Sequence, residues 1–392
     1  MISVVSGFLG VVLGCGSTGD TAELPDIGSP RYGEVNEAQL RRMVETPPES
    51  DGPFYMVNLI KFREKADYAD GRETDLTGRE ADAIYAPLEF LEAIGAEIAF
   101  VGEVEDNLIT RDGVTWDQIG IVKYPSRAEF LALTQDPEFR SRAIHKDAGV
   151  ERSIVMVADR QDPVMAPPPD VIPNPATPMD PAVAITHLLA YHAVAQYPPS
   201  ADEPERDGRE AMSLYEQAAT GVALQQGGGS VARFDIEGVF IGDARAWDEF
   251  RINVFPSHRA FDVVVADPTR QAGEFHREAA LEDTYSQASQ IVINAFASGG
   301  SGALEVTDNG TGRLCVSDDS CDGQEASTCL TDGSGTGFCT VEGCGAGECE
   351  GDYLCCHDCA DFAANLLPFD DSACVPGSLT AQLSGTPMCS CD

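Results

Sequence analysis

The 392-residue chain has few basic residues and, over most of its length, no cysteine. Only 25 lysine and arginine residues stand against 65 aspartate and glutamate residues, which gives a formal net charge of −40. Nucleic acids and anionic lipid headgroups bind to basic surfaces, so neither is expected as a partner. The excess of acidic over basic residues is typical of a solvated acidic surface, and it also suits cation binding or a salty medium.

Long apolar runs and the compact motifs of common enzymes are absent as well. The uncharged residues 2–13 are too few to cross a bilayer as a helix. The sequence contains no glycine-rich phosphate loop, no His-Glu-x-x-His, no Gly-x-Ser-x-Gly and no EF-hand spacing. His187 and His192 are not spaced like a helical zinc pair. We therefore expect no metal and no cofactor, and whether the chain is an enzyme stays open.

The N-terminal apolar run has the length of a signal-peptide core and ends in Gly14-Cys15. Small residues before a cysteine resemble the lipobox of bacterial lipoproteins, in which that cysteine carries the lipid. The resemblance implies a signal peptide over residues 1–15, a lipidated Cys15 and a tether over residues 16–50. It departs from the usual pattern because no lysine or arginine precedes the apolar run. Within the tether, residues 36–44 are expected to form a short helix before a proline pair.

The remaining twelve of the 13 cysteines lie in the last part of the chain. They are Cys315, Cys321, Cys329, Cys339, Cys344, Cys349, Cys355, Cys356, Cys359, Cys374, Cys389 and Cys391. An even, clustered set in a polar segment is typical of a disulfide framework and of an oxidising compartment. We expect residues 313–392 to form an acidic disulfide module, whose pairing the sequence does not reveal. Zinc binding by these thiols is the less favoured alternative.

Six short segments recur in the same order, at an offset of 130 residues at first and 131 from the tryptophans onward. The pairs are residues 77–81 with 207–211, Tyr85 with Tyr215, Trp116-Asp117 with Trp247-Asp248, residues 124–126 with 255–257, residues 136–137 with 267–268, and residues 145–148 with 276–279. So many matches with one residue of slippage indicate a tandem duplication.

Apolar patterning in the first copy predicts β-α-β-β-α-β order, the ferredoxin-like arrangement. Strands are expected at residues 54–62, 98–109, 116–124 and 154–157, and a helix at 78–95 that Pro87 breaks. Ser126 and Glu129 predict a capping box at the second helix. The fold class is thus α+β. Because a four-stranded sheet with helices on one face leaves its other face bare, we expect the two copies to form a pseudo-dimeric α+β barrel within one chain.

The predicted domains follow from these boundaries. The copies occupy residues 51–160 and 182–297, a proline-rich linker 161–181 separates them, and a Gly/Ser linker 298–312 precedes the tail. Residues 56–62, 77–81, 116–117 and 124–130 resemble the bacterial "domain of unknown function 1330" family of the dimeric α+β barrel superfamily. The resemblance is weaker in the second copy, where His187 stands in the place of Asn58. The family implies no activity, since its superfamily includes monooxygenases, haem enzymes and binding modules.

His145 and His276 are the leading candidates for acid–base chemistry, because imidazole titrates near neutrality. A structural role at the helix–sheet junction is the favoured alternative for both. Arg79 and Arg209 could bind a carboxylate, although a salt bridge within the domain is favoured. Side chains alternate between the two faces of a strand, so Arg251 points to the face opposite its neighbours in sequence and is expected to face solvent.

The tryptophans and their neighbours are the candidates for lining a ligand pocket. Trp116-Asp117 and Trp247-Asp248 begin a strand after a turn, where the indoles could floor a pocket or plug the open side of the barrel. Tyr85 and Tyr215 lie on the apolar helical face, so core packing is their default role.

These observations favour an exported binding or interaction lipoprotein, anchored by lipid to the outer membrane or surface of a bacterial cell envelope. Its expected partner is a small molecule or an envelope protein, and its only membrane contact is the lipid. The alternative is a cofactor-independent oxidase or monooxygenase acting on a small aromatic or carbonyl compound. In that alternative His145 or His276 is the base, and Trp116 or Trp247 lines the site.

The lipid anchor is testable by metabolic labelling with radioactive palmitate in a bacterial host. We expect label in the wild-type chain and none in Cys15→Ser, because the thiol is the acylated atom. Ser17→Ala, two residues away, serves as the matched control and should keep its label. Label that persists in Cys15→Ser would contradict the anchor.

Overall fold

The structure is a computed structural model that describes residues 24–161, 171–177, 179–201 and 203–296. In the C-terminal region it describes only the backbone of six short strands. Within these parts of the chain, no helix combines the length and apolar character needed to traverse a membrane. The signal peptide, Cys15 and the side chains of the other twelve cysteines lie outside the described residues, so those expectations stay predictions.

The first copy contains four strands and four short helices. They are β2 (Phe54–Phe62), α2 (Gly78–Tyr85), α3 (Leu88–Ala93), β3 (Glu97–Ile109), β4 (Gln118–Tyr124), α4 (Arg127–Gln135), α5 (Pro137–Gly149) and β5 (Val150–Gln161). The expected break at Pro87 is confirmed, since α2 ends before it and α3 begins after it. The last strand is longer than the four residues that the sequence predicts.

The second copy repeats this order with one helix in place of two. Its elements are β6 (Val183–Tyr191), the 3₁₀ turn η1 (Pro199–Ala201), α6 (Gly208–Gln225), β7 (Gly229–Gly242), β8 (Glu249–Phe255), α7 (His258–Ala266), α8 (Pro268–Ala280) and β9 (Leu281–Asn294). Gln217 stands where the first copy has Pro87, so α6 continues without a break.

The helix starts are fixed by side-chain caps that the two copies share. Thr77 and Glu80 form a reciprocal capping box at α2, and Asp207 caps α6 through the N–H of Glu210. At α4, Ser126 accepts the N–H of Glu129 at 3.0 Å. The reciprocal box thus forms at α2 and not at α4, where the sequence predicts it.

The glycine that follows the caps of α2 and α6 allows the start of each helix to approach the end of another helix closely. A Cβ at Gly78 would lie 2.3 Å from the carbonyl oxygen of Gly149, and one at Gly208 would lie 2.5 Å from that of Ala280. Both carbonyls belong to the last residue of a helix, Gly149 in α5 and Ala280 in α8. A glycine is therefore required at this position in both copies, because any side chain would push the two backbones apart.

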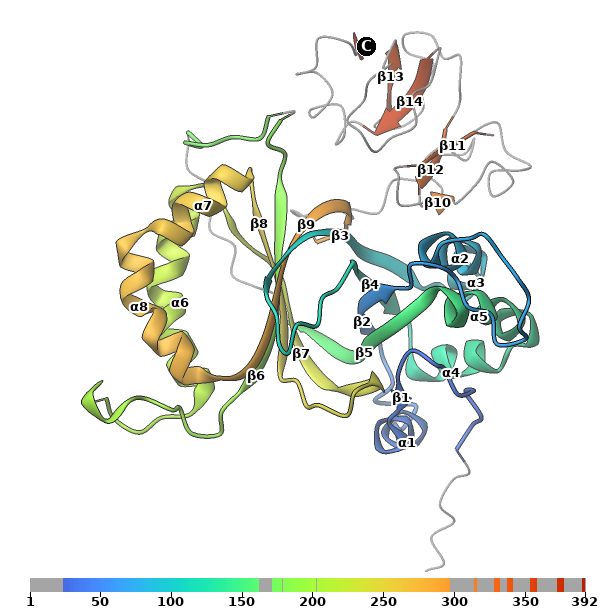
Figure 1. Ribbon diagram of the computed structural model, residues 1–392, viewed down its shortest axis with the longest axis horizontal. Helices are drawn as coiled ribbons and strands as arrows, with labels where there is room; N and C mark the ends of the chain where they lie inside the picture. The colour runs from blue at the N-terminus through green and yellow to red at the C-terminus, as the bar shows by residue number, and fades with distance from the viewer. Residues whose placement is uncertain are drawn as a thin grey trace, which may run out of the picture.

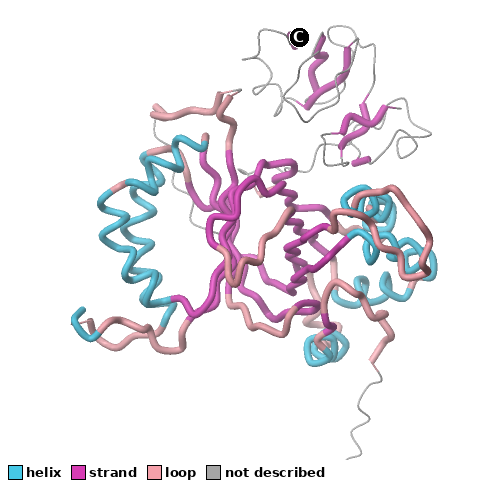
Figure 2. Tube along the Cα trace, in the orientation of Figure 1, coloured by secondary structure: helices cyan, strands magenta, loops and turns pink. Residues whose placement is uncertain are grey.

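The eight long strands of the two copies close a single barrel. Strand order is β7-β5-β2-β4-β3-β9-β6-β8, and β8 pairs back with β7, always antiparallel. Two seams join the copies, β3 with β9 and β5 with β7. Because each seam uses an edge strand of both copies, neither copy leaves an exposed sheet edge there. In Figures 1 and 2 the helices α6 and α8 cover one side of the strands, and α2 to α5 cover the opposite side.

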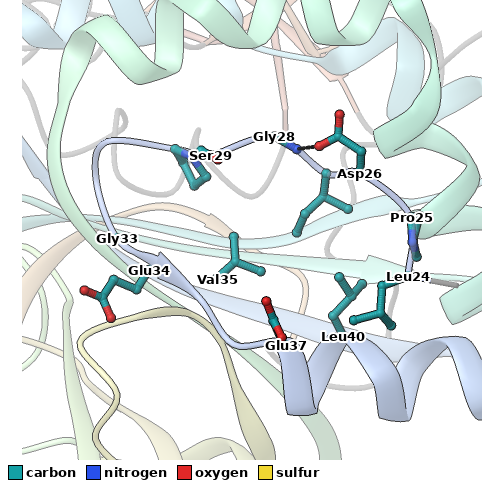
Figure 3. A pocket seen from close by; sticks show the side chains of 12 residues that line it. Leu24, Pro25, Asp26, Gly28, Ser29, Gly33, Glu34, Val35, Glu37 and Leu40 are labelled. Carbon is teal, nitrogen blue, oxygen red and sulfur yellow. Dashed lines mark hydrogen bonds between the residues drawn. The ribbon is translucent and has the colours of Figure 1, made fainter. Parts of the chain in front are cut away.

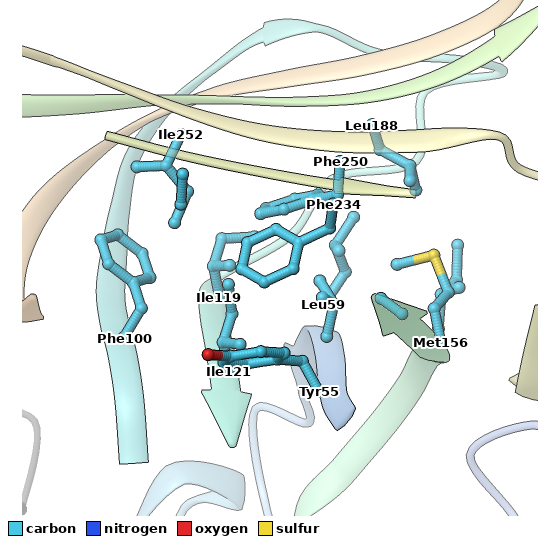
Figure 4. Packing of buried hydrophobic residues seen from close by; sticks show 14 of the residues in the cluster. Tyr55, Leu59, Phe100, Ile119, Ile121, Met156, Leu188, Phe234, Phe250 and Ile252 are labelled. Carbon is cyan, nitrogen blue, oxygen red and sulfur yellow. The ribbon is translucent and has the colours of Figure 1, made fainter. Parts of the chain in front are cut away.

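Apolar side chains of both copies fill the barrel interior (Figure 4). Phe100 and Ile121 of the first copy meet Phe234 and Phe250 of the second, and all four are fully buried. The rings of Tyr55 and Phe234 pack edge to face across the copies, with centroids 5.1 Å apart. The sheet faces that the sequence leaves bare are thus covered by one another.

The segment before the first copy is folded rather than extended. Residues 24–50, expected to belong to a tether, include β1 (Glu34–Val35), which pairs with β7, and α1 (Glu37–Glu45), which Asn36 caps. Arg31 fixes the segment to α5 through Asp147, with Nε 2.6 Å from Oδ2. Leu40 and Met43 are buried against the outer face of the sheet. A surface hollow of about 420 Å³ lies within this segment, between residues 24–35 and α1 (Figure 3).

Two three-stranded antiparallel sheets occur in the C-terminal region. One has the order β10-β12-β11 and the other β14-β13-β15. Their strands are β10 (Leu314–Cys315), β11 (Thr328–Thr331), β12 (Gly337–Thr340), β13 (Tyr353–His357), β14 (Ser372–Pro376) and β15 (Ser390–Cys391).

Interior packing predicts the stability of the barrel. Phe250→Ala deletes a fully buried ring, so we expect a loss of about 3–5 kcal/mol in the free energy of unfolding by urea. Val263→Ala, on the outer helix α7 and 39% exposed, is the control and should lose less than about 1 kcal/mol. Equal losses in the two variants would contradict a shared interior core.

Candidate functional site

The two tryptophans lie inside the barrel. Trp116 and Trp247 are 2% and 4% exposed, and both contact the ring of Tyr285. The ring centroids lie 5.7 Å from Tyr285 for Trp116 and 5.5 Å for Trp247. Of the two roles open from the sequence, this geometry corresponds to the plug and not to the floor of a pocket under the helices.

The aspartate after each tryptophan holds two strands together. Asp117 accepts the backbone N–H of Phe62 at 2.8 Å and pairs with Lys61 at 2.7 Å. Asp248 accepts the N–H of Tyr191 at 2.7 Å in the second copy. Their carboxylates are engaged with the backbone of β2 and β6, which accounts for the recurring Trp-Asp pair without a ligand.

The recurring histidines bind tyrosines in nearby loops. Nδ1 of His145 lies 2.6 Å from the hydroxyl of Tyr68, and Nδ1 of His276 lies 2.7 Å from that of Tyr197. Burial, with nearby arginines, lowers the pKa of His145; burial lowers that of His276. Both histidines lie on outer helices, whereas the tryptophans lie in the interior, so the structure does not bring the proposed base and pocket wall together.

The recurring arginines form ion pairs within their own copies. Arg79 contacts Glu103 at 2.6 Å and stacks on Phe62. Arg209 contacts Glu249 at 3.1 Å and stacks on Tyr191 in the same way. The favoured alternative for these residues, a salt bridge within the domain, is what the structure contains.

Tyr85 and Tyr215 both lie between helix and sheet but have different neighbours. Tyr85 packs edge to face on Phe139, with centroids 6.0 Å apart. Tyr215 lies under the guanidinium of Arg270, whose Cζ is 5.6 Å from the ring centroid. The same position therefore contacts a phenylalanine and Lys146 in the first copy, and an arginine in the second.

A cluster of charged side chains lies under α6 and α8, on the helix-facing side of the second sheet. We call it the arginine cluster. Its members are Glu216 on α6, Arg233 on β7, Glu249 and Arg251 on β8, and Arg270, Glu274 and Arg277 on α8.

Glu249 is the centre of one half of this cluster and is fully buried. It accepts hydrogen bonds from Arg233 at 2.7 Å and from Tyr191 at 3.1 Å, and it also contacts Arg251. Arg251 bridges onward to Glu216. The expectation that Arg251 faces solvent is wrong: its side chain is 12% exposed, because the face that it shares with Glu249 is covered by helices.

Glu274 is the centre of the other half. It pairs with Arg270 at 3.0 Å and with Nη1 of Arg277 at 3.3 Å. Nη2 of Arg277 is buried and has no hydrogen-bond partner in the described part of the chain. Arg209 contacts both Glu249 and Asp235. With Arg209 and Asp235 added, five arginines face three glutamates and one aspartate, and one positive charge is not compensated by these ion pairs.

His187 on β6 adds an uncharged imidazole beside these arginines. Its Nδ1 lies 2.7 Å from Oγ of Ser286 on β9. Burial first, and then the charges of Arg277, Arg251 and Arg270, lower its pKa from 6.5 to about 3. His187 is therefore neutral at pH 7 and adds no positive charge to the cluster.

The first copy lacks this cluster. The two copies can be aligned by the repeat and by strand register. In this alignment, all but one of the positions of the cluster, of His187 and of Ser286 correspond to an uncharged residue in the first copy. The pairs are Asn58 with His187, Ala86 with Glu216, Val101 with Arg233, Gln118 with Glu249, Gly120 with Arg251, Phe139 with Arg270, Ala143 with Glu274, Lys146 with Arg277 and Val155 with Ser286.

Sequence reasoning finds only part of this site. It names Arg251, although as a solvent-facing residue, and it names the neighbouring Arg209 and Tyr215 and the exchange of Asn58 for His187. It leaves out the glutamates, Arg233 and the arginines of α8. A comparison of the copies position by position would reveal them, because at all of these positions except that of Lys146 and Arg277 the charge appears only in the second copy. No three His, Cys, Asp or Glu side chains gather in metal-binding geometry among the described residues.

No family model matches the chain, and no curated protein matches it. Similar solved structures exist. A protein of unknown function from Rhodopseudomonas palustris is 29% identical, over 34% of this chain and 100% of that chain, with a TM-score of 0.30. An anthrone oxidase-like protein is 15% identical over 62% of this chain and 92% of that one, with a TM-score of 0.36. A chlorite dismutase from Candidatus Nitrospira defluvii is 12% identical over 65% and 95%, with a TM-score of 0.33. At these low TM-scores the likenesses carry no argument for function.

The lowered pKa of His187 predicts a loss of stability in acid. The neutral imidazole stabilises the fold fully above pH 6.5, and this contribution is lost as the pH falls toward 3, because the unfolded chain takes up a proton first. His187→Asn, which installs the residue of the first copy, should remove about 2 kcal/mol of the stability difference between pH 7 and pH 5. Urea unfolding at both pH values measures this. An unchanged difference in the variant would contradict the assignment.

Proposed function

We propose that the chain is an envelope-anchored binding protein and that its second copy binds a small anion between the helices and the sheet. The anion is a carboxylate or a comparable oxyanion, held by the arginine cluster. One observation supports this above all others: around Glu274, two arginines face one glutamate, and Nη2 of Arg277 is buried with no hydrogen-bond partner among the described residues.

A buried guanidinium nitrogen without an acceptor is costly, since its desolvation is not offset by a hydrogen bond. A carboxylate at Nη2 would supply the missing acceptor and the missing negative charge together. Arginine suits this ligand because its planar donors match the oxygens of carboxylate and phosphate.

The rest of the molecule would repel such a ligand. With a net charge of −40 the surface disfavours anions at long range, and salt screens this repulsion. Attraction must therefore come from close contact, which favours a small ligand that reaches below the helices. Arg233, Glu216 and Glu274 keep 35%, 27% and 29% of their side chains exposed, so the cluster is reachable from solvent.

The alternative of a cofactor-independent oxidase has less support from the geometry. It requires a histidine and a tryptophan on one cavity, whereas His145 and His276 lie outside the barrel and Trp116 and Trp247 inside it. Lipid anchoring places the proposed binding protein at a bacterial surface, where a small carboxylate would be captured from the medium.

Anion binding is testable by titration calorimetry with acetate, succinate, benzoate and inorganic phosphate. We expect at least one of these probes to bind the wild-type chain. Arg277→Gln should weaken that binding about tenfold or more, because a charge-assisted hydrogen bond contributes about 1.5–3 kcal/mol. Arg277→Lys keeps the charge and should lie between the two.

Arg142→Gln is the matched control. Arg142 lies on α5, the first copy's counterpart of α8, and it also pairs with a glutamate. Its affinity should equal that of the wild type. Urea unfolding of each variant separates loss of the site from loss of the fold. Equal affinity in Arg277→Gln and wild type, or no binding of any probe to a folded wild-type chain, would refute the proposal.

A further inference from the structure

Strand register in the C-terminal region brings cysteines opposite one another. Seven of the twelve C-terminal cysteines lie within the strands β10 to β15, namely Cys315, Cys329, Cys339, Cys355, Cys356, Cys374 and Cys391. Six of these seven are aligned with another cysteine, in three pairs. The seventh, Cys315, is aligned with Gly337. The backbone therefore bears on the connectivity that the sequence leaves open.

The first pair belongs to the strands β11 and β12. Cys329 on β11 is aligned with Cys339 on β12. The Cα atoms of directly opposite residues in an antiparallel pair of strands lie about 4.5–5.5 Å apart. A disulfide joins Cα atoms that are about 4.4–6.8 Å apart. The pairing of the two strands therefore sets these positions at a separation that a disulfide spans without a shift of either backbone.

The other two pairs share β13, the central strand of the second sheet (Figure 1). Cys355 is aligned with Cys374 on β14, and the next residue, Cys356, is aligned with Cys391 on β15. Successive residues of a strand belong to opposite faces of its sheet, whereas directly opposite residues share a face. Cys355 and Cys356 therefore cannot bond to each other while β13 is a strand, and each face of this sheet has one cysteine pair.

This placement favours disulfides over zinc at these six positions. A structural zinc site gathers four ligands around one ion, with each sulfur about 2.3 Å from the metal. The two pairs of β13 lie on opposite faces of one sheet, so they cannot share an ion. Each pair supplies only two of the four ligands, whereas two opposite cysteines are all that a disulfide needs.

We propose that three disulfides cross-link the two C-terminal sheets: Cys329–Cys339, Cys355–Cys374 and Cys356–Cys391. Each forms when one thiolate of a pair attacks the disulfide of a thiol–disulfide oxidoreductase, and the second thiol then displaces that enzyme from the mixed disulfide. The two cysteines give up two electrons and two protons, and the disulfide of the oxidoreductase takes them up to become two thiols. The chain therefore matures in an oxidising compartment. These bonds do not depend on the anion site of the second copy.

Disulfide mapping by mass spectrometry tests the pairing on the full chain, exported to the periplasm of a bacterial host. Free thiols are alkylated with a maleimide in denaturant. The unreduced chain is then digested with pepsin at low pH, where thiolates are too scarce for disulfides to exchange. We expect Cys329 and Cys339 in one linked pair of peptides, and the peptide that contains residues 355–356 joined to both Cys374 and Cys391.

Single substitutions assign the two bonds of β13, whose cysteines are adjacent in one peptide. In Cys374→Ser we expect the maleimide on Cys355, and in Cys391→Ser we expect it on Cys356, because each substitution removes only the partner of that thiol. Ser372→Ala, also on β14, is the matched control and should leave both cysteines unlabelled. Fragmentation of the reduced peptide locates the label.

The wild-type map needs no variant to fold. A bond from Cys329 to any cysteine other than Cys339 would overturn the first pair. Maleimide on a different cysteine in either serine variant would overturn the pair concerned. Zinc bound to these thiols in place of disulfides, measured by atomic absorption on the purified chain, would overturn all three.

Discussion

The pairing of β3 with β9 and of β5 with β7 is the interaction on which the rest of this structure depends. Each copy alone would be a four-stranded sheet with one face of large apolar side chains exposed. The two seams turn those faces toward one another, and Phe100, Phe234 and Phe250 become fully buried as a result. Stabilisation grows with the apolar surface area that is removed from water. The closed barrel is therefore the arrangement that these sequences favour. The recurring tryptophans serve the same end, since both pack on Tyr285 inside.

Closure leaves only the helix-facing sides of the two sheets free to differ. Inside the barrel a change in one copy disturbs the packing of both. Outside it, each copy has its own contacts between helices and sheet, and the two sets of contacts have diverged. The first contains Asp82, Lys146 and tyrosines, and the second contains Arg251, Arg277 and their glutamates. Duplication followed by divergence on the outer faces thus gives the two copies different side chains between helix and sheet.

Local signals in the sequence predict much of this fold. Residues 54–62 form the expected strand, Pro87 breaks the first helix, and Asn36 caps a helix that begins one residue later. These features depend on neighbours within a few residues. The packing of residues 24–50 was not predictable in this way, because the contact of Arg31 with Asp147 joins positions 116 residues apart. The candidate site was missed for the same reason. Arg251 alternates like a solvent-facing residue, and only the register of β6, β8 and the helices above them shows that it is buried beside Glu249.

Native-state hydrogen exchange tests the central claim of a single closed barrel most directly. The amides of Val101 and Ile293 face each other across one seam, and those of Val157 and Gly238 face each other across the other. If the barrel is one unit, these amides exchange only through global unfolding, with the same opening free energy as Leu59 and Leu188 in the central strands β2 and β6. Seam amides that exchange through a separate, lower-energy opening, while each copy stays folded, would show instead that the copies are independent domains and would contradict this account.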